Sequence, residues 1–444
     1  MKVIIVGGGT GGMCLAHGLK KAGIPVTVLE RYRGRADGLF GYRVGIDPTG
    51  SKALHECLPA ETFELFLATC ARRPAAFNVL TQRMRTTASI GLPEPAVPSE
   101  GEQSVSRAVL RQVLFTGMDD VVEFGKTFTH YDHNADGTVT AHCDDGAQHV
   151  AGVLVAADGT RLAVRAQYLP DAQIRDAGVI AIATKTALTN EVRASLPDHV
   201  FGAVTMILGT RGMVGVLHAM EFPWDDRGSV LPGTGPRARQ LIEAWPQLAD
   251  GAAGDYVNLS VMTSADRYPP DATQRRGSDL IQLALDLTTN WHPSLRRLVS
   301  QSDPDSAFPV NVLTSVPLEP WPTTNVTLLG DALHTMTPGH GVGANTALRD
   351  AALLCRALTE VHTGQRQLHD AVSDYEQQVI PYGFERVRDS LNQNATRGDD
   401  PLYRPATRRL ALFGARTYFS LTSRVPSMRQ KFVDSMTEYR GADF

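Results

Sequence analysis

The first residues of the chain contain a glycine pattern that strongly restricts the fold. Met1 to Val6 is an apolar run rich in β-branched residues, which is typical of a buried parallel strand. Gly7, Gly9 and Gly12 follow in a G-x-G-x-x-G arrangement. The first glycine permits a tight turn, the second lets the backbone approach a pyrophosphate, and the third lets a helix pack close to the strand. The pattern predicts a Rossmann-type βαβ unit.

The residues after this turn complete the unit. Gly11 to Ala22 is predicted to be a helix whose N-terminal amides face the phosphates, and Gly23 with Pro25 ends it. Val26 to Leu29 is the second strand, and a carboxylate at Glu30 can accept hydrogen bonds from ribose hydroxyls. Because Glu30 disfavours a 2′-phosphate, the unit suits the adenosine of FAD or NAD. A glycine-rich turn without a ligand is the alternative.

A second segment near residue 330 indicates which dinucleotide is bound. Val326 to Gly330 is another apolar strand, and Asp331 at its end can bond the ribitol hydroxyls of a flavin. The loop that follows has little side-chain bulk, so its backbone can lie against a flat ring. The helix that starts near Gly343-Ala344-Asn345 points its positive N-terminus at the pyrimidine end of that ring. We therefore expect FAD, although a helix cap after a loop is the alternative. The loop glycines and proline are Pro338, Gly339, Gly341 and Gly343.

Two positions between these segments complete the expected cofactor site. The apolar strand that begins at Val153 reaches Asp158-Gly159. Arg107 lies at the start of an amphipathic helix in SVSRAVLRQVL, from where it can reach the FAD pyrophosphate. A solvated helix residue is the alternative for Arg107.

Together these motifs resemble those of the class A, single-component flavoprotein monooxygenases. This family includes para-hydroxybenzoate hydroxylase, salicylate hydroxylase and the tetracycline-inactivating oxygenases. GGGTGG with Glu30 resembles the GxGxxG of the family, AADGTRLAVR its DG motif, and GDALHTMTPGHGVGANTALRDA its GD motif. GYRVGIDPTGSKAL resembles the segment in which an arginine, here Arg43, lies beside the flavin. Ala157 replaces a usual glycine and Leu162-Ala163 a common serine, which leaves the substrate side undetermined.

The motifs and the resemblance define a set of expected site residues. Arg43 and His218 are the candidates for catalysis. A salt bridge is the alternative for Arg43, and a packed strand histidine is the alternative for His218. No catalytic acid or base is assigned, and no metal site is predicted. The expected cofactor-binding residues are Gly7, Gly9, Thr10, Gly11, Gly12, Glu30, Arg31, Arg43, Arg107, Asp158, Asp331, Pro338, Gly341, Gly343, Ala344 and Asn345.

The resemblance also implies a reaction. NADPH or NADH would reduce FAD, and the reduced flavin would react with O2 to give a C4a-hydroperoxide. This species would hydroxylate or epoxidise an aromatic or polycyclic small molecule, in natural-product tailoring or aromatic catabolism. A second GxGxxG is not found, which fits a reductant that binds transiently. The alternatives are a flavin-dependent reductase or dehydrogenase of the geranylgeranyl reductase type and a non-catalytic flavin-binding redox sensor. The tryptophans do not form the W-x-W-x-I-P segment of halogenases.

The expected fold class is α/β, with a Rossmann-type FAD-binding domain, an inserted antiparallel-sheet substrate domain and a helical C-terminal region. Residues 1–177 and 324–381 would form the FAD-binding domain, 178–323 the substrate domain and 382–444 the C-terminal helices. That last segment either packs on the body of the protein and roofs the substrate cavity, or contacts a membrane or a partner. Pro381 would bend or divide a long helix. The expected substrate strands are Val179–Thr184, Phe201–Leu208, Met213–Phe222 and Tyr256–Thr263.

Composition limits the partners and the cellular compartment that we expect. A formal net charge of −4 gives no indication of nucleic acid as a partner. The five scattered cysteines favour free thiols in a reducing compartment. The N-terminal run breaks into glycines and so does not resemble a signal peptide, and we find no apolar stretch long enough for a membrane span. We expect a cytoplasmic monomer or homodimer without membrane contacts.

One motif is rejected. DHNADG, Asp132 to Gly137, matches the first half of a calcium-binding loop. Cys143 stands at the position where such a loop requires a bidentate glutamate, and the flanks are typical of strands. Asp136-Gly137 is therefore predicted to be a hairpin turn.

Overall fold

The computed structural model describes the chain except residues 36, 39–42, 96, 98–100, 162, 226, 246–253, 339–340, 393–396 and 442–444. Within this described part, a parallel sheet of five strands has the order β17-β11-β1-β2-β7. Its central strand β1 is entirely buried, as the apolar run predicts. The strands are β1 (Val3–Val6), β2 (Val26–Glu30), β7 (Val122–Phe124), β11 (Val153–Ala156) and β17 (Val326–Leu328).

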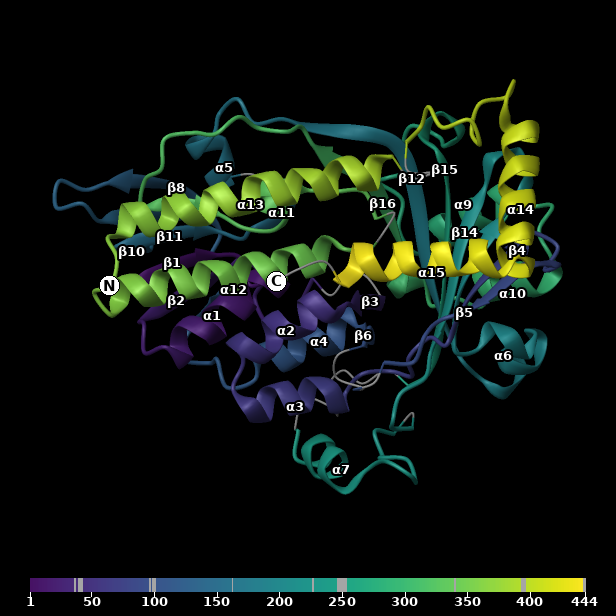
Figure 1. The fold of residues 1–444 in the computed structure, drawn as a ribbon, viewed down its shortest axis with the longest axis horizontal. Helices are drawn as coiled ribbons and strands as arrows, with labels where there is room; N and C mark the ends of the chain where they lie inside the picture. The colour runs from purple at the N-terminus through teal and green to yellow at the C-terminus, as the bar shows by residue number, and fades with distance from the viewer. Residues whose placement is uncertain are drawn as a thin grey trace.

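Long helices pack beside this sheet, and α12 contacts α1, α2 and α13 (Figure 1). Of the two expected effects of Pro381, a bend or a division of the long helix, the division is wrong, because α13 continues through that proline. The helices of this part are α1 (Thr10–Lys21), α2 (Pro48–Cys57), α3 (Ala60–Ala68), α4 (Arg107–Phe115), α5 (Ala163–Tyr168), α11 (Asp331–His334), α12 (Gly343–His362) and α13 (Leu368–Leu391).

A second, larger sheet stands beside the first part (Figure 1). Seven strands of the described residues form it in the order β16-β12-β15-β14-β13-β4-β5. Its pairs are antiparallel except β4 with β13, which is parallel. β4 and β5 come from residues 76–91, so the sheet includes a segment that lies outside the expected range 178–323. The strands are β4 (Ala76–Thr81), β5 (Thr86–Gly91), β12 (Ile174–Ala187), β13 (Ala203–Leu208), β14 (Val214–Met220), β15 (Tyr256–Ser264) and β16 (Phe308–Ser315).

One face of this sheet has its own core. Trp291 is buried there, and its ring lies so close to Gly215 that a side chain at that glycine would collide with it. A short connection from Gly209 to Met213 joins β13 to β14, which pair antiparallel. The helices of this core are α6 (Asn190–Ser195), α9 (Gly277–Leu287) and α10 (Pro293–Ser300), whereas α7 (Pro236–Glu243) packs against α3.

The described residues also form two smaller sheets. β3 (Arg43–Ile46) pairs with β6 (Gln103–Ser106). β8 (Phe128–His133), β9 (Val139–Cys143) and β10 (Gln148–Ala151) form an antiparallel sheet. The predicted turn between β8 and β9 is confirmed, because Gly137 has a positive φ of 80° and the Asp136 carboxylate accepts the Thr138 amide at 3.0 Å.

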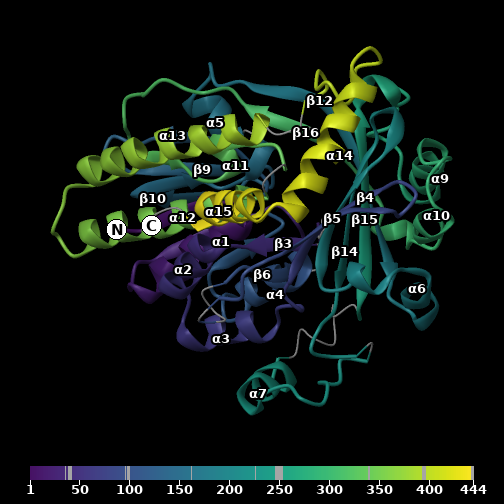
Figure 2. The ribbon, with the colours of Figure 1, turned by 45° about the vertical axis from the view of Figure 1, so that its right-hand side comes forward.

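The C-terminal segment packs on the body of the protein. α14 (Arg408–Arg424) lies against β5, and α15 (Pro426–Gly441) turns back towards α2 (Figures 1 and 2). Both helices line the large cavity described below, through Tyr418, Phe419 and Phe432 among others. Among the helices of the described residues, none combines the length and apolar character that a bilayer span requires.

Burial of His17 makes stability depend on pH. Its Nε2–H donates to the carbonyl of Leu114 at 2.8 Å, and burial lowers the pKa of His17 to about 4. Between pH 6.5 and 4 the unfolded chain binds a proton at this histidine that the folded chain does not bind. The contribution of His17 to the free energy of unfolding is therefore fully present above pH 6.5. It decreases as the pH falls, and at pH 5 about 2 kcal/mol has been lost.

Glutamine at this position can still donate a hydrogen bond to Leu114 but cannot titrate. We therefore predict that in His17→Gln the urea midpoint of unfolding decreases less between pH 7.5 and 5 than in the wild type. His133→Gln, at an exposed histidine, serves as the control and should keep the wild-type slope. If the urea midpoint of His17→Gln depended on pH as steeply as that of the wild type, burial of His17 would not be the cause of the pH dependence.

Candidate functional site

A single cavity of about 1450 Å³ lies between the parallel sheet, one face of the seven-stranded sheet and the two C-terminal helices. Cavities for one drug-sized ligand span roughly 300–1,000 Å³. The cavity therefore has room for a dinucleotide and a second molecule.

Its floor is the turn after β1. Gly7 has a φ of +110°, and a side chain there would overlap the carbonyl of Ala157 at the end of β11. A side chain at Gly12 would overlap the carbonyl of Gly7. Because only glycine fits at both positions, α1 starts directly beneath the cavity with its first amides unpaired within the helix. Gly9, Thr10 and Gly11 line the cavity together with these two glycines.

Glu30 lies at the edge of this floor. One carboxylate oxygen accepts the Gly8 amide at 2.9 Å, and the other accepts the Tyr32 amide at 3.0 Å. Arg111 Nη2 lies 3.6 Å from the first oxygen. A carboxylate has about four acceptor positions, so Glu30 can still accept from a ribose. Arg31 also lines the cavity, and its Nη2 donates to the Tyr32 hydroxyl.

Two arginines on successive turns of α4 point to an anionic ligand. Arg107, the first residue of α4, lines the cavity, as does Arg111. The Nε and Nη2 atoms of Arg111 are buried without a hydrogen-bond partner among the described residues. Burial lowers the pKa of Arg111, and the carboxylate of Glu30 opposes this. Sequence analysis missed Arg111, although its i+4 spacing from Arg107 places it on the same helical face.

Acidic residues stand at the far end of the floor. Asp331, the first residue of α11, faces the cavity, and the surrounding protein raises its pKa. Behind it, the Asp350 carboxylate accepts the Gly330 amide at 2.9 Å and contacts His334 Nε2 at 2.7 Å. Asp158 also lines the cavity. Burial raises its pKa, and its Oδ1 has no hydrogen-bond partner among the described residues.

Asn345 connects the start of α12 to β3. Its Oδ1 accepts the Asp47 amide at 3.0 Å, and its Nδ2 donates to the Gly45 carbonyl at 2.9 Å. This tie fixes the loop before α12. The expected loop residues Pro338, Gly341, Gly343 and Ala344 line the cavity with Asn345, while Gly339 and His340 lie outside the described residues.

Arg43 lines the cavity and is also paired. Its Nη2 donates to Glu102 at 2.6 Å, and its Nε donates to the Ser104 hydroxyl at 2.8 Å. The salt bridge given as the alternative for Arg43 is therefore present, and Arg43 also lines the cavity. Sequence analysis did not find Glu102, since only the pairing of β3 with β6 brings it beside Arg43.

His218 is held behind this pair. Its Nδ1–H donates to the Ala203 carbonyl at 3.0 Å, which leaves Nε2 to accept from Ser104 at 3.3 Å. Burial holds its pKa well below the ordinary value. His218 is absent from the described cavity lining, so the structure places it as a packed strand histidine that supports Ser104 and, through it, Arg43.

These residues fit FAD. The bare glycine turn and the two arginines suit a pyrophosphate. Glu30 suits the adenosine ribose, and Asp331 with the low-bulk loop suits the flavin end. The unpartnered buried atoms of Arg111 and Asp158 are polar groups that such a ligand would satisfy.

The remainder of the cavity, here named the substrate chamber, differs in chemistry. Among the described residues, the lining contributed by the seven-stranded sheet, Leu402, α14 and α15 carries no charge, whereas Arg43 and Glu102 line the same cavity beside it. The side of β13 that faces it carries Met206 and Leu208. The chamber is lined by Phe77, Val179, Ala181, Met206, Leu208, Val214, Val216, Ser260, Met262, Val310, Val312, Leu402, Ala415, Tyr418, Phe419, Phe432, Ser435 and Met436.

Three phenylalanines close the chamber where β4 meets the C-terminal helices. The ring of Phe77 lies 5.7 Å from that of Phe432 and 6.3 Å from that of Phe419, measured between centroids. Phe419 and Phe432 are 6.1 Å apart in an edge-on arrangement. Such aromatic groups exclude water and offer flat apolar surfaces.

Comparisons with known proteins agree with this geometry. Residues 1–39 and 262–383 match a family model described as an FAD binding domain. A solved structure from Photorhabdus luminescens, described as an FAD-containing monooxygenase, is 34% identical, covers 89% of this chain and 98% of its own, and superposes with a TM-score of 0.74. The chain belongs to the class A FAD-dependent monooxygenase family. The fold expected from the sequence is confirmed.

Two further proteins are similar to this chain. Klebsiella pneumoniae HpxO, solved with FAD and uric acid, shares the fold with a TM-score of 0.75 at 19% identity, covering 99% of this chain and 96% of its own. The dual O-methyltransferase/FAD-dependent monooxygenase elcB of Phaeosphaeria nodorum is 30% identical over 95% of this chain. The chain spans only 47% of the length of that protein.

Arg111 provides a test of the cofactor site. We predict that Arg111→Gln weakens FAD binding to the apoprotein by about 10- to 100-fold, the usual cost of losing a charge-assisted hydrogen bond. Quenching of FAD fluorescence on titration measures this. Arg35→Gln removes an arginine that pairs with Asp119 at the surface and should bind FAD as the wild type does. Equal affinities in the two variants would contradict a phosphate-binding role for Arg111.

Proposed function

We propose that this chain is an FAD-dependent monooxygenase that uses NADH or NADPH and O2 to hydroxylate or epoxidise an uncharged aromatic or polycyclic compound. The observation that supports the proposal is one cavity that joins the expected FAD-binding residues to an apolar chamber, whose described lining from the seven-stranded sheet, α14 and α15 carries no charge. The five free thiols support a reducing compartment, the cytoplasm. We propose a monomer or homodimer as its assembly.

For hydroxylation the overall reaction balances as substrate–H + NAD(P)H + H⁺ + O2 giving substrate–OH + NAD(P)⁺ + H2O. Bound FAD would accept a hydride from the nicotinamide and pass its electrons to O2. The glycine turn, Glu30, Arg107, Arg111 and Asp331 would hold it.

The chain itself contributes orientation and exclusion of water. Apolar side chains from the seven-stranded sheet and from α14 and α15 surround the chamber, so a planar substrate is held by dispersion and desolvation rather than by ion pairs. Exclusion of water from this space protects oxygen transfer from side reactions. Arg43 remains the proposed polar contact for flavin or substrate, because Glu102 and Ser104 fix its position.

Labelled oxygen tests the reaction. Purified FAD-loaded protein is incubated with NADH or NADPH, ¹⁸O2 and a panel of neutral phenols and polycyclic aromatics. We expect one substrate class to accelerate NAD(P)H oxidation and to gain one ¹⁸O atom. A product formed equally well without oxygen would indicate a reductase instead, and FAD binding without turnover of any compound would indicate a redox sensor.

The apolar substrate chamber predicts that neutral aromatic compounds bind more tightly than anionic ones. We expect 2-naphthol to bind about 100-fold more tightly than 3-hydroxy-2-naphthoate, because burying an unpaired carboxylate costs several kcal/mol. Perturbation of the flavin absorbance spectrum measures both affinities. Met206→Lys, which places a cation in the chamber, should reverse part of the preference. Comparable affinities of the wild-type protein for the two compounds would contradict the assignment of this chamber.

A further inference from the structure

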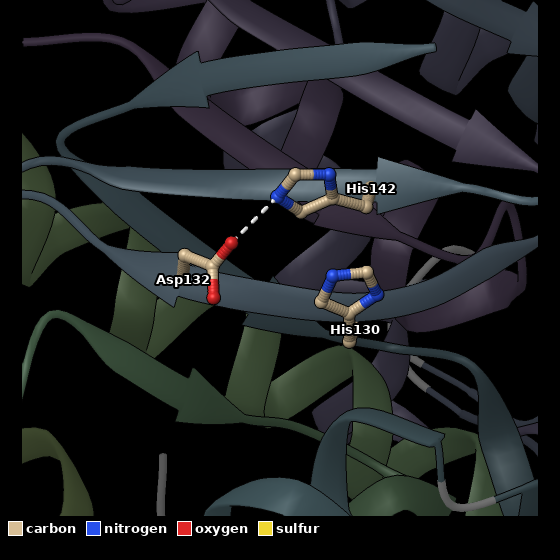
Figure 3. Close-up of side chains that lie close together, drawn as sticks. All are labelled: His130, Asp132 and His142. Carbon is tan, nitrogen blue, oxygen red and sulfur yellow. Dashed lines mark hydrogen bonds and ion pairs between the residues drawn. The ribbon is translucent and has the colours of Figure 1, made fainter. Parts of the chain in front are cut away.

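The outer face of the β8–β9 hairpin brings together two histidines and an aspartate (Figure 3). His130 on β8 is paired directly with His142 on β9, and Asp132 follows two residues later on β8. Residues with this spacing lie on one face of a strand pair. One ligand atom from each of the three side chains lies within 4.8 Å of the other two.

The three groups face a common space. The imidazole rings are stacked with centroids 4.3 Å apart and planes 3° from parallel. His142 Nε2 lies 2.9 Å from Asp132 Oδ2, and Figure 3 shows the carboxylate beside the edges of both rings. Asp132 is exposed, so the cluster is open to solvent.

The neighbouring threonine prepares His130 to act as a ligand. The Thr129 hydroxyl donates to the His142 carbonyl at 3.0 Å, so its oxygen accepts from His130 Nδ1 at 3.0 Å. This assigns the proton of His130 to Nδ1 and leaves a free lone pair on Nε2. An outer hydrogen bond that fixes the tautomer and ring orientation is the usual support of a metal-bound histidine.

We propose that His130, Asp132 and His142 bind one divalent transition-metal ion, Zn²⁺ or Cu²⁺, at a site separate from the FAD cavity. Two imidazoles and one carboxylate suit these ions, whereas Ca²⁺ requires a shell of oxygen ligands. The sequence pattern that fails as a calcium loop thus contributes Asp132 to a different metal site. Binding at about 2.1 Å per ligand requires the three ligand atoms to draw closer together, which the exposed Asp132 side chain permits while Thr129 keeps the tautomer of His130.

A bound ion would crosslink β8 to β9. The three side chains leave a fourth position open for water or for Gln148, which is paired with His142 on β10. β8 begins at Phe128, which lines the cavity, but the cluster lies further along that strand. The ion should therefore raise the melting temperature without changing FAD content.

Metal binding to the full chain tests the site. Tag-free, FAD-loaded protein is stripped with a chelator and titrated with Zn²⁺ against a chromophoric competitor. We expect one Zn²⁺ per chain and a higher melting temperature. His130→Asn and His142→Asn should each weaken binding by more than tenfold, and Asp132→Asn by about tenfold. Electron paramagnetic resonance of the Cu²⁺-loaded wild type should show coupling to two imidazole nitrogens.

His133→Asn is the matched control, since it removes an exposed imidazole from the same strand outside the cluster. It should bind Zn²⁺ within about twofold of the wild type, a change well below the effect of losing a ligand. The proposal is overturned if the wild type binds no Zn²⁺, if the His130 and His142 variants bind as it does, or if the control loses as much affinity as they do. All variants should retain wild-type FAD absorbance, which separates this result from the proposed oxygenase function.

Discussion

The close approach of two backbone segments controls the cofactor half of this molecule. Gly7 lies against the carbonyl of Ala157, and Gly12 lies against the carbonyl of Gly7, at distances that exclude any side chain. This contact sets how near α1 comes to the ends of β1 and β11. The position of Glu30 and the direction of the first helical amides follow from it. A methyl group at either glycine would displace the floor on which the dinucleotide rests.

The two regions of the cavity differ in the charge of their lining residues. Arginines and carboxylates gather where a dinucleotide would lie, and several have polar atoms without partners. The substrate chamber beyond them offers apolar surface with the hydroxyls of Ser260, Tyr418 and Ser435. Recognition there depends on shape and desolvation, so a change of substrate needs only a change in volume at the sheet face or in α14 and α15.

Local patterns in the sequence predicted many of the residues that line one end of the cavity. The strand, turn, helix and acid from Val3 to Glu30 depend on short-range chemistry, and Arg107 and Asp331 face the cavity as their motifs indicated. Arg111 was missed although the helical period contains it. Glu102 meets Arg43 only through the pairing of β3 with β6, and β4 joins β13 in parallel across a long stretch of chain. Sequence patterns carry no information on which distant strands become neighbours, so these features required the structure.

The wide separation of the two cofactor-binding segments affects how the chain acquires its native state. During synthesis the βαβ unit at residues 3–30 leaves the ribosome long before β17 and the start of α12, which complete the sheet edge and the loop. Contacts between such remote segments form slowly because a long loop must close first. Until β17 arrives, the parallel sheet therefore has an unpaired edge at β11, where another strand could pair wrongly.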